Sequence, residues 1–174
     1  MRLQGKRIAF LIGPGFEDLE FWVVYMRLLE EGADVTVVGL KAGESYPSKH
    51  GCLSATADVA AADVTRDQFD AVVVPGGWCP DKIRRYEAVT ALVKGLYDQK
   101  KIVGMICHAG LVGISARIVS GHRATGSTGI KDDLVNAGAT WVDEPAFRDG
   151  NLVWGRVVAD IPDFNRELVT ALAG

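Results

Sequence analysis

Cysteine is scarce in this sequence, as are several other features that would place the chain in a specialised class. Its three cysteines, Cys52, Cys79 and Cys107, lie far apart and form no C-x-x-C pair, which is poor material for a disulfide framework or a zinc knuckle. This pattern fits a reducing compartment, so we expect a cytoplasmic protein. No apolar run reaches the roughly 18 to 20 residues that span a bilayer, and no signal-peptide pattern opens the chain, so we expect no membrane partner.

An excess of basic charge is also missing. Lys and Arg number 19 against 22 Asp and Glu, and the net charge is −3. A nucleic-acid binder needs a basic stripe to neutralise phosphates, so we expect no DNA or RNA partner. A metal site would have to combine His50, Cys79 and His108 with a carboxylate, and we expect none. We interpret His50 as a solvated loop residue and His122 as a surface residue.

The sequence does contain a regular alternation of short β-branched runs and longer helical stretches. Continuous apolar strands that alternate with helices are typical of a mostly parallel sheet covered on both faces. With no repeat, linker or low-complexity segment, we expect a single α/β domain over residues 1–174. The expected strands are 7–12, 34–39, 70–74, 101–106, 123–125 and 140–142, and the expected helices are 18–31, 81–86, 88–99, 108–118, 130–137 and 160–172. Residues 44–57 form a hairpin or an irregular excursion, and residues 147–155 resemble a hairpin.

Three of these strands end in unusual chemistry. They are followed by residues 13–17 (GPGFE), 75–79 (PGGWC) and 107–110 (CHAG). Sites in open α/β sheets form at the carboxyl ends of strands, so we expect these segments to converge. Glu17 and Asp18 stand where a phosphate would bind, and no Lys-Ser/Thr pair follows residues 13–15. We therefore expect no nucleotide, flavin or other cofactor.

Cys107 stands between a buried strand and a helix. This layout resembles a nucleophile elbow, in which a sharp turn lifts a side chain off the sheet into a pocket. The unpaired amides of a helix N-terminus favour a thiolate, so the sequence predicts a pKa below the free value of roughly 8.5. The alternative is a buried structural cysteine, and the neighbouring His108 and Gly76-Gly77 loop favour the nucleophile.

Five segments of the chain match sequence motifs of a known family. They are residues 15–20 (GFEDLE), 74–77 (VPGG), 106–108 (ICH), 130–138 (IKDDLVNAG) and 149–153 (DGNLV), and the last of them leads to the helix that begins at residue 160. In these segments, in their order and over nearly its whole length, the sequence resembles the PfpI branch of the DJ-1/PfpI superfamily. The resemblance implies a flavodoxin-like three-layer α/β/α sandwich with a cysteine nucleophile elbow. It also implies a homo-oligomer: a dimer, trimer or hexamer.

Carried over to this sequence, the resemblance makes Cys107 the nucleophile and His108 its adjacent histidine. Glu17 falls on the acid that hydrogen-bonds the cysteine sulfur, a role that requires a raised pKa. The alternative is that Glu17 caps the following helix, a role that Asp18 could also fill. Gly76 and Gly77, with the amide of His108, would form an oxyanion hole; without the resemblance, Pro-Gly-Gly would indicate only a tight turn.

The remaining candidates surround these residues. Asp81 matches the third catalytic carboxylate of the branch, which reaches the histidine of a neighbouring subunit, and a helix N-terminal acid is the alternative. Trp78, Cys79 and Ala109 would line the pocket. Cys79 is also considered as a resolving thiol after oxidation of Cys107.

The resemblance implies attack by the Cys107 thiolate on a small reactive carbonyl, such as methylglyoxal or its early adduct on an amine or thiol. That activity would be glyoxalase III-like or that of a deglycase. Two alternatives stay open. The same machinery could cleave peptides as an intracellular cysteine peptidase, or Cys107 could be oxidised without turnover in a stress-response redox sensor or chaperone.

Overall fold

The core of the protein is a sheet of seven strands in the order β10-β11-β7-β6-β1-β2-β5, in which only β10 is antiparallel to its neighbour. This strand order and direction confirm the expected mostly parallel α/β sheet. The computed structural model describes residues 1–174. The strands are β1 (Arg7–Leu11), β2 (Asp34–Gly39), β5 (Val59–Ala60), β6 (Ala71–Val74), β7 (Ile102–Ile106), β10 (Ala146–Asp149) and β11 (Leu152–Gly155).

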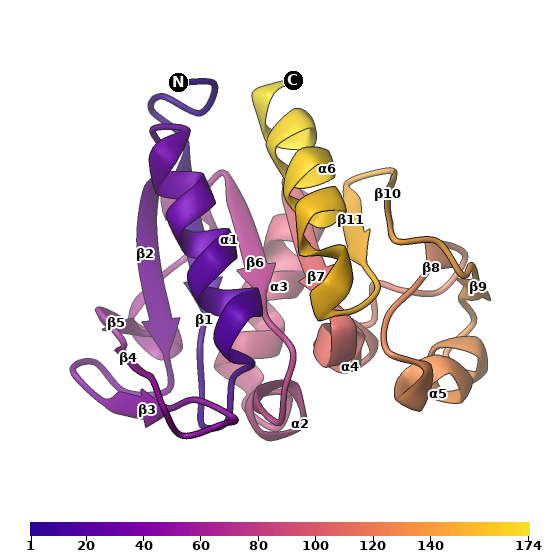
Figure 1. Cartoon of the computed structure of the whole chain (residues 1–174), viewed down its shortest axis with the longest axis horizontal. Coiled ribbons are helices and arrows are strands. Elements are labelled where there is room, and N and C mark those ends of the chain that lie inside the picture. Colours follow the sequence, from indigo (N-terminus) through magenta and orange to yellow (C-terminus); the bar gives the residue numbers. More distant parts are fainter.

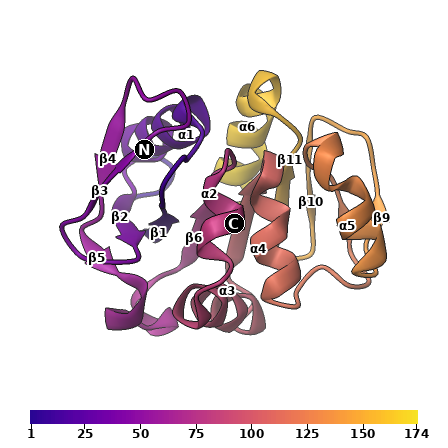
Figure 2. The same cartoon turned by 90° about the horizontal axis from the view of Figure 1, so that it is seen from below.

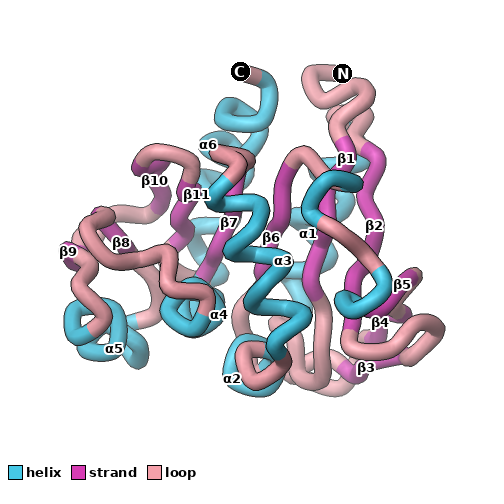
Figure 3. Tube along the Cα trace, turned by 180° about the vertical axis from the view of Figure 1, so that it is seen from behind, coloured by secondary structure: helices cyan, strands magenta, loops and turns pink.

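Helices cover both faces of this sheet. Seen along the strands, α1 and α6 lie on one face, and α3 and α4 lie on the other (Figure 2). Figure 3 shows α3 running across the back of the sheet. The three layers match the sandwich expected from the sequence. The helices are α1 (Asp18–Glu30), α2 (Cys79–Ile83), α3 (Glu87–Asp98), α4 (Gly110–Ser115), α5 (Lys131–Asn136) and α6 (Ile161–Ala173).

Some short elements differ from the expectation. Strands β8 (Arg123–Ala124) and β9 (Thr140–Trp141) pair with each other and lie with α5 beside the main sheet (Figure 1). The first expected hairpin is present as β3 (Ser45–Pro47) and β4 (Ser54–Thr56). The helix expected at residues 108–118 begins as a 3₁₀ turn, and α4 ends at Ser115 because Arg117 adopts a left-handed conformation with φ 57°.

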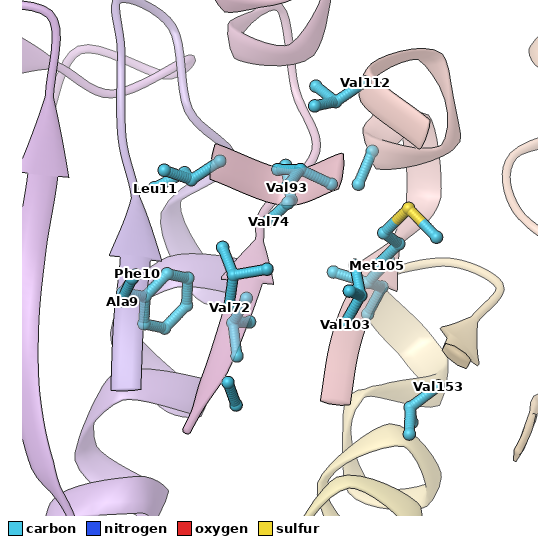
Figure 4. Packing of buried hydrophobic residues seen from close by; sticks show 14 of the residues in the cluster. Ala9, Phe10, Leu11, Val72, Val74, Val93, Val103, Met105, Val112 and Val153 are labelled. Carbon is cyan, nitrogen blue, oxygen red and sulfur yellow. The ribbon is translucent and has the colours of Figure 1, made fainter. Parts of the chain in front are cut away.

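Burial explains why the strands read as continuous apolar runs. Every residue of β6 and β7 is buried, as strands covered on both faces require. Figure 4 shows Phe10 of β1, Val72 of β6 and Met105 of β7 among the packed side chains, with Val93 of α3 and Val112 of α4 above them. None of the helices combines the length and apolar character of a bilayer-spanning helix.

The parallel arrangement determines where side chains from distant segments meet. Strands β1, β6 and β7 are neighbours in parallel register, so their carboxyl ends reach the same edge of the sheet. In Figure 1 this is the lower edge, and both chain termini lie at the opposite end. The three unusual segments of the sequence follow β1, β6 and β7, and the predicted convergence is confirmed.

Candidate active site

Cys107 occupies a strained turn at the end of β7. Its φ of 61° lies in the left-handed region that residues with a Cβ rarely adopt, whereas Ile106 before it is still extended. Such a conformation costs on the order of 1–2 kcal/mol, and here a fully buried strand and the turn that leads into α4 impose it. The sharp strand-to-helix turn predicted at Cys107 is present, and the role of Cys107 as a nucleophile stays a prediction.

The glycine loop after β6 closes over this turn. A Cβ on Gly76 would lie 2.8 Å from the Cβ of Cys107 and 2.4 Å from a carboxyl oxygen of Glu20. Gly77 has φ 77°, and a Cβ there would lie 2.4 Å from the carbonyl oxygen of Gly15. Neither position has room for a side chain, so the two glycines allow the loop to approach the cysteine closely.

Two backbone amides point at the sulfur. The backbone N–H groups of His108 and Gly77 lie near the Cys107 sulfur and lower the pKa of its thiol. The third predicted member of the oxyanion hole is different, because the Gly76 N–H donates to Oε2 of Glu20 at 2.7 Å. Of the three predicted oxyanion-hole donors, Gly77 and His108 line the cavity beside Cys107, whereas Gly76 does not line it and its N–H is bonded to Glu20. The oxyanion hole itself stays a prediction.

The acid beside the sulfur is Glu20, not Glu17. Glu20 is completely buried, its carboxyl is close enough to Cys107 to raise the pKa of the thiol, and its Oε1 has no hydrogen-bond partner. Glu17 instead caps α1, with Oε2 accepting from the amides of Leu19 and Glu20 at 2.9 Å each. The prediction that Glu17 bonds the cysteine sulfur is therefore wrong. Glu17 caps the helix, as the alternative interpretation had it.

The sequence contains a signal that identifies Glu20. The buried face of α1 includes Val24 and Leu28, which lie four and eight residues after Glu20. Residues at this spacing share one side of a helix. Of the two acids in the first turn, Glu20 is the one in line with Val24 and Leu28 and the one that is completely buried.

Burial raises the pKa of the Glu20 carboxyl to about 7, and the nearby charge of Glu17 adds to the effect. Burial also raises the pKa of the Cys107 thiol to about 12, with a further contribution from the negative charge of Glu20. The amides of His108 and Gly77 lower it, but by less. The predicted lowering of the Cys107 pKa is therefore wrong, because enclosure and an adjacent acid outweigh the start of a short helix.

His108 is placed to exchange a proton with the thiol. Its Nδ1 lies 3.3 Å from Sγ of Cys107. Burial lowers the pKa of the imidazole below 6.5, and the positive charge of Lys49 lowers it further. His108 is therefore neutral at pH 7 and can accept a proton at Nδ1. No carboxylate of the same chain pairs with its other ring nitrogen.

The cysteine opens into a cavity of about 330 Å³. Of the three predicted lining residues, Trp78 lines it, whereas Cys79 and Ala109 do not, because both are fully buried in the apolar core. Burial raises the pKa of Cys79 to about 12, and its side chain does not reach the cavity in which a resolving thiol would meet Cys107. The sequence reasoning missed several lining residues, namely Lys49, Ser127, Val157, Val158 and Ala159.

Asp81 lies in α2, outside this cavity. Its side chain is 58% exposed and pairs with Arg85 one turn later. Within one chain the structure does not bring Asp81 to His108, so a catalytic role would need a second subunit.

A cluster of ligand-type atoms lies next to the site. One oxygen each of Glu17 and Asp18 and the Nδ1 of His50 all lie within 4.8 Å of one another. These groups already bond protein atoms, since Glu17 caps α1 and Asp18 accepts from the His50 ring at 2.8 Å. His50 is exposed as expected, yet this bond anchors it. His122 is less exposed than expected and lies between Tyr97 and Asp149.

Comparison with known proteins agrees with this geometry. The DJ-1/PfpI family model matches residues 6–171. The chain belongs to the DJ-1/PfpI family.

Relatives of this DJ-1/PfpI chain match it over nearly its full length. A Pyrococcus abyssi protein named Deglycase PYRAB04690 is 40% identical, and the match covers 95% of this chain and 99% of the relative. General stress protein 18 of Bacillus subtilis is 37% identical, and the match covers 97% of this chain and 98% of the relative. A crystal structure from Anabaena variabilis, a two-domain protein with DJ-1/ThiJ/PfpI-like and ferritin-like domains, superposes with a TM-score of 0.94 at 37% identity. That match covers 96% of this chain and 48% of the other.

Proposed function

We propose that this protein is a cysteine-dependent enzyme that acts on small reactive carbonyl compounds, such as methylglyoxal or its early adducts on amines and thiols. The observation that carries the proposal is the meeting of the Cys107 thiol, Nδ1 of His108 and the Gly77 and His108 amides in one cavity of about 330 Å³. A cavity of this size suits a small molecule better than a peptide. The relative named as a deglycase also supports this proposal.

The first step needs a thiolate. With Glu20 ionised, its charge opposes removal of the thiol proton. Because the pKa of Glu20 is about 7, this carboxyl can take up a proton near neutral pH, which removes the opposing charge and gives the sulfur a hydrogen-bond donor. Neutral His108 can also accept the thiol proton, because its Nδ1 lies 3.3 Å from Sγ of Cys107.

The thiolate then adds to the aldehyde carbon, and the carbonyl electron pair moves to oxygen. The amides of Gly77 and His108 stabilise this oxyanion. In methylglyoxal the hydrogen of the former aldehyde carbon moves to the neighbouring carbonyl carbon, which gives a lactoyl thioester. Water releases lactate and restores the thiol. Methylglyoxal plus water thus gives lactate without an external oxidant or reductant.

The test is glutathione-independent loss of methylglyoxal with lactate detected. We expect Cys107→Ala to lose turnover by at least about 10³-fold, because the covalent step is removed. The matched control is Cys52→Ala, which removes an exposed thiol outside the cavity and should stay within about twofold of wild type. Equal rates in wild type and Cys107→Ala would refute the proposal.

The proposal includes assembly into a homo-oligomer in which Asp81 of one subunit reaches His108 of another. It is supported by the exposed position of Asp81 and by the absence of a carboxylate partner for His108 within the chain. We expect Asp81→Asn and Cys107→Ala each to be poorly active alone. Mixed and reassembled, they should regain activity, because a shared site then combines intact Cys107 with intact Asp81. Failure to regain activity, with mixed assembly verified by mass, would rule out action across the interface.

A further inference from the structure

Lys49 lies on the wall of the Cys107 cavity, and no carboxylate neutralises it. It lines the cavity together with Cys107 and His108. Since His108 is neutral at pH 7, Lys49 is the only positive charge among the lining residues. Its ammonium forms none of the salt bridges of the chain, although acids outnumber bases in the sequence.

The Lys49 ammonium is held against Trp78. Its Nζ lies 5.2 Å from the centroid of the indole ring, within the range of a cation–π contact. Trp78 also lines the cavity and is 58% exposed, which is unusual for a residue of its size. The contact keeps the charge at the cavity wall while leaving its N–H groups available to a ligand.

Hydrogen bonds fix the backbone at Lys49 and at the next residue. The Lys49 N–H donates to the carbonyl oxygen of Phe16 at 2.7 Å. The next residue, His50, is bonded to Asp18 through its backbone at 3.2 Å and through its ring at 2.8 Å. The bonds between His50 and Asp18 thus position the loop that carries Lys49.

The charge of Lys49 reaches the reacting groups. It contributes to the lowered pKa of His108 and opposes the rise in the pKa of Glu20. The acid that also lines the cavity, Glu17, has one carboxyl oxygen bound by two amides at the start of α1, which partly offsets its negative charge. A negatively charged group entering the cavity therefore meets a cation that no protein group pairs with.

We infer that Lys49, held over Trp78, binds a carboxylate of the substrate, so that Cys107 reacts preferentially with carbonyl compounds that carry a carboxylate near the reacting carbon. This substrate class rests on the proposed function. A carboxylate–ammonium pair in a partly enclosed cavity forms charge-assisted hydrogen bonds, which favour anionic over neutral compounds of the same shape.

The first test needs no turnover. Iodoacetate and iodoacetamide alkylate the same sulfur and differ chiefly in charge. The rate constants at Cys107 are measured by mass spectrometry of its peptide, which separates it from exposed Cys52. We expect Lys49→Met to lower the iodoacetate-to-iodoacetamide rate ratio about tenfold. A change in the pKa of the thiol cancels in this ratio, because both reagents consume the same thiolate.

Lys6→Met is the matched control, since it removes an equal charge just before β1, at the opposite edge of the sheet. Its ratio should equal that of wild type. Lys49→Arg, which keeps the charge and the contact with Trp78, should stay within about threefold. A circular dichroism spectrum and a urea unfolding midpoint like those of wild type show that Lys49→Met is folded. A wild-type ratio in Lys49→Met would overturn the inference.

The second test uses turnover. Methylglyoxal adducts of N-acetylcysteine and of N-acetylcysteine amide differ in a single carboxylate. In Lys49→Met we expect KM for the carboxylate adduct to rise about fivefold with kcat little changed, and KM for the amide adduct to stay constant. Equal changes for both adducts would overturn the inference. If wild type turns over neither adduct, the proposed function fails, while the alkylation ratio still decides the role of Lys49.

Discussion

Two adjacent strand ends carry a cysteine each, and only one of them makes a site. Cys79 begins α2 after β6, and Cys107 follows β7. The pKa of each thiol is raised to about 12, so this value alone does not distinguish them. The causes do. Only burial raises the pKa of Cys79, whereas the pKa of Cys107 is raised by burial and also by the charge of Glu20.

This difference determines which thiol can be activated. Burial by packed side chains is permanent while the protein stays folded. The charge of Glu20 is not permanent. Because the pKa of its carboxyl is about 7, uptake of a proton near neutral pH removes the charge. Cys107 also has His108 at 3.3 Å and a cavity in front of it, and Cys79 has neither. A thiol with a raised pKa can therefore be a nucleophile when the group that raises the pKa can itself be neutralised.

The largest effect is expected from Glu20→Gln, which removes the charge that distinguishes the two cysteines. Burial raises the pKa of Glu20 from 4.5 to about 7, so the fold favours the protonated acid. The stability that this carboxyl contributes is fully present below pH 4.5 and is lost as pH rises through 7. Gln cannot ionise, so the free energy of unfolding of the variant relative to wild type should rise by on the order of 3 kcal/mol between pH 4.5 and pH 8.

The same variant should lower the pKa of Cys107, because the negative charge beside the sulfur is gone. Urea unfolding at several pH values measures the first effect, and the pH profile of iodoacetamide alkylation measures the second. Glu30→Gln is the control, an equal charge change at an exposed acid of the same helix. A stability difference that does not vary with pH, or an alkylation profile like that of wild type, would contradict the assignment of Glu20.

Much of the architecture could be predicted from the sequence because it follows from local pattern. The buried runs of β6 and β7 and the alternation with helices determine a parallel sheet, and the parallel sheet places Cys107 beside Gly76. The choice between Glu17 and Glu20 depends on which side of the first turn of α1 faces the sheet, and carrying the family resemblance over to this sequence assigned the role to Glu17 instead.

The pKa of Cys107 could not be predicted for a different reason. The sign of its shift depends on a balance between two amide donors and an enclosing cavity with a buried acid. The sequence shows the helix start but not the depth of burial. Lys49 was missed similarly, because only the folded chain brings the loop after β3 against the residues that follow β6.

Cys79→Ala should have the smallest effect and tests the other half of the comparison. The side chain is fully buried in the core, with its sulfur next to Gly13. Removing the sulfur leaves a small cavity, so we expect a loss of about 1–2 kcal/mol in the free energy of unfolding, measured in urea. Alkylation of Cys107 and turnover should stay within about twofold of wild type, because no atom of Cys79 lines the cavity. If the variant instead changed the recovery of activity after mild peroxide treatment, Cys79 would be reaching Cys107 by an opening of α2. Burial alone would then no longer explain why only one of the two cysteines reacts.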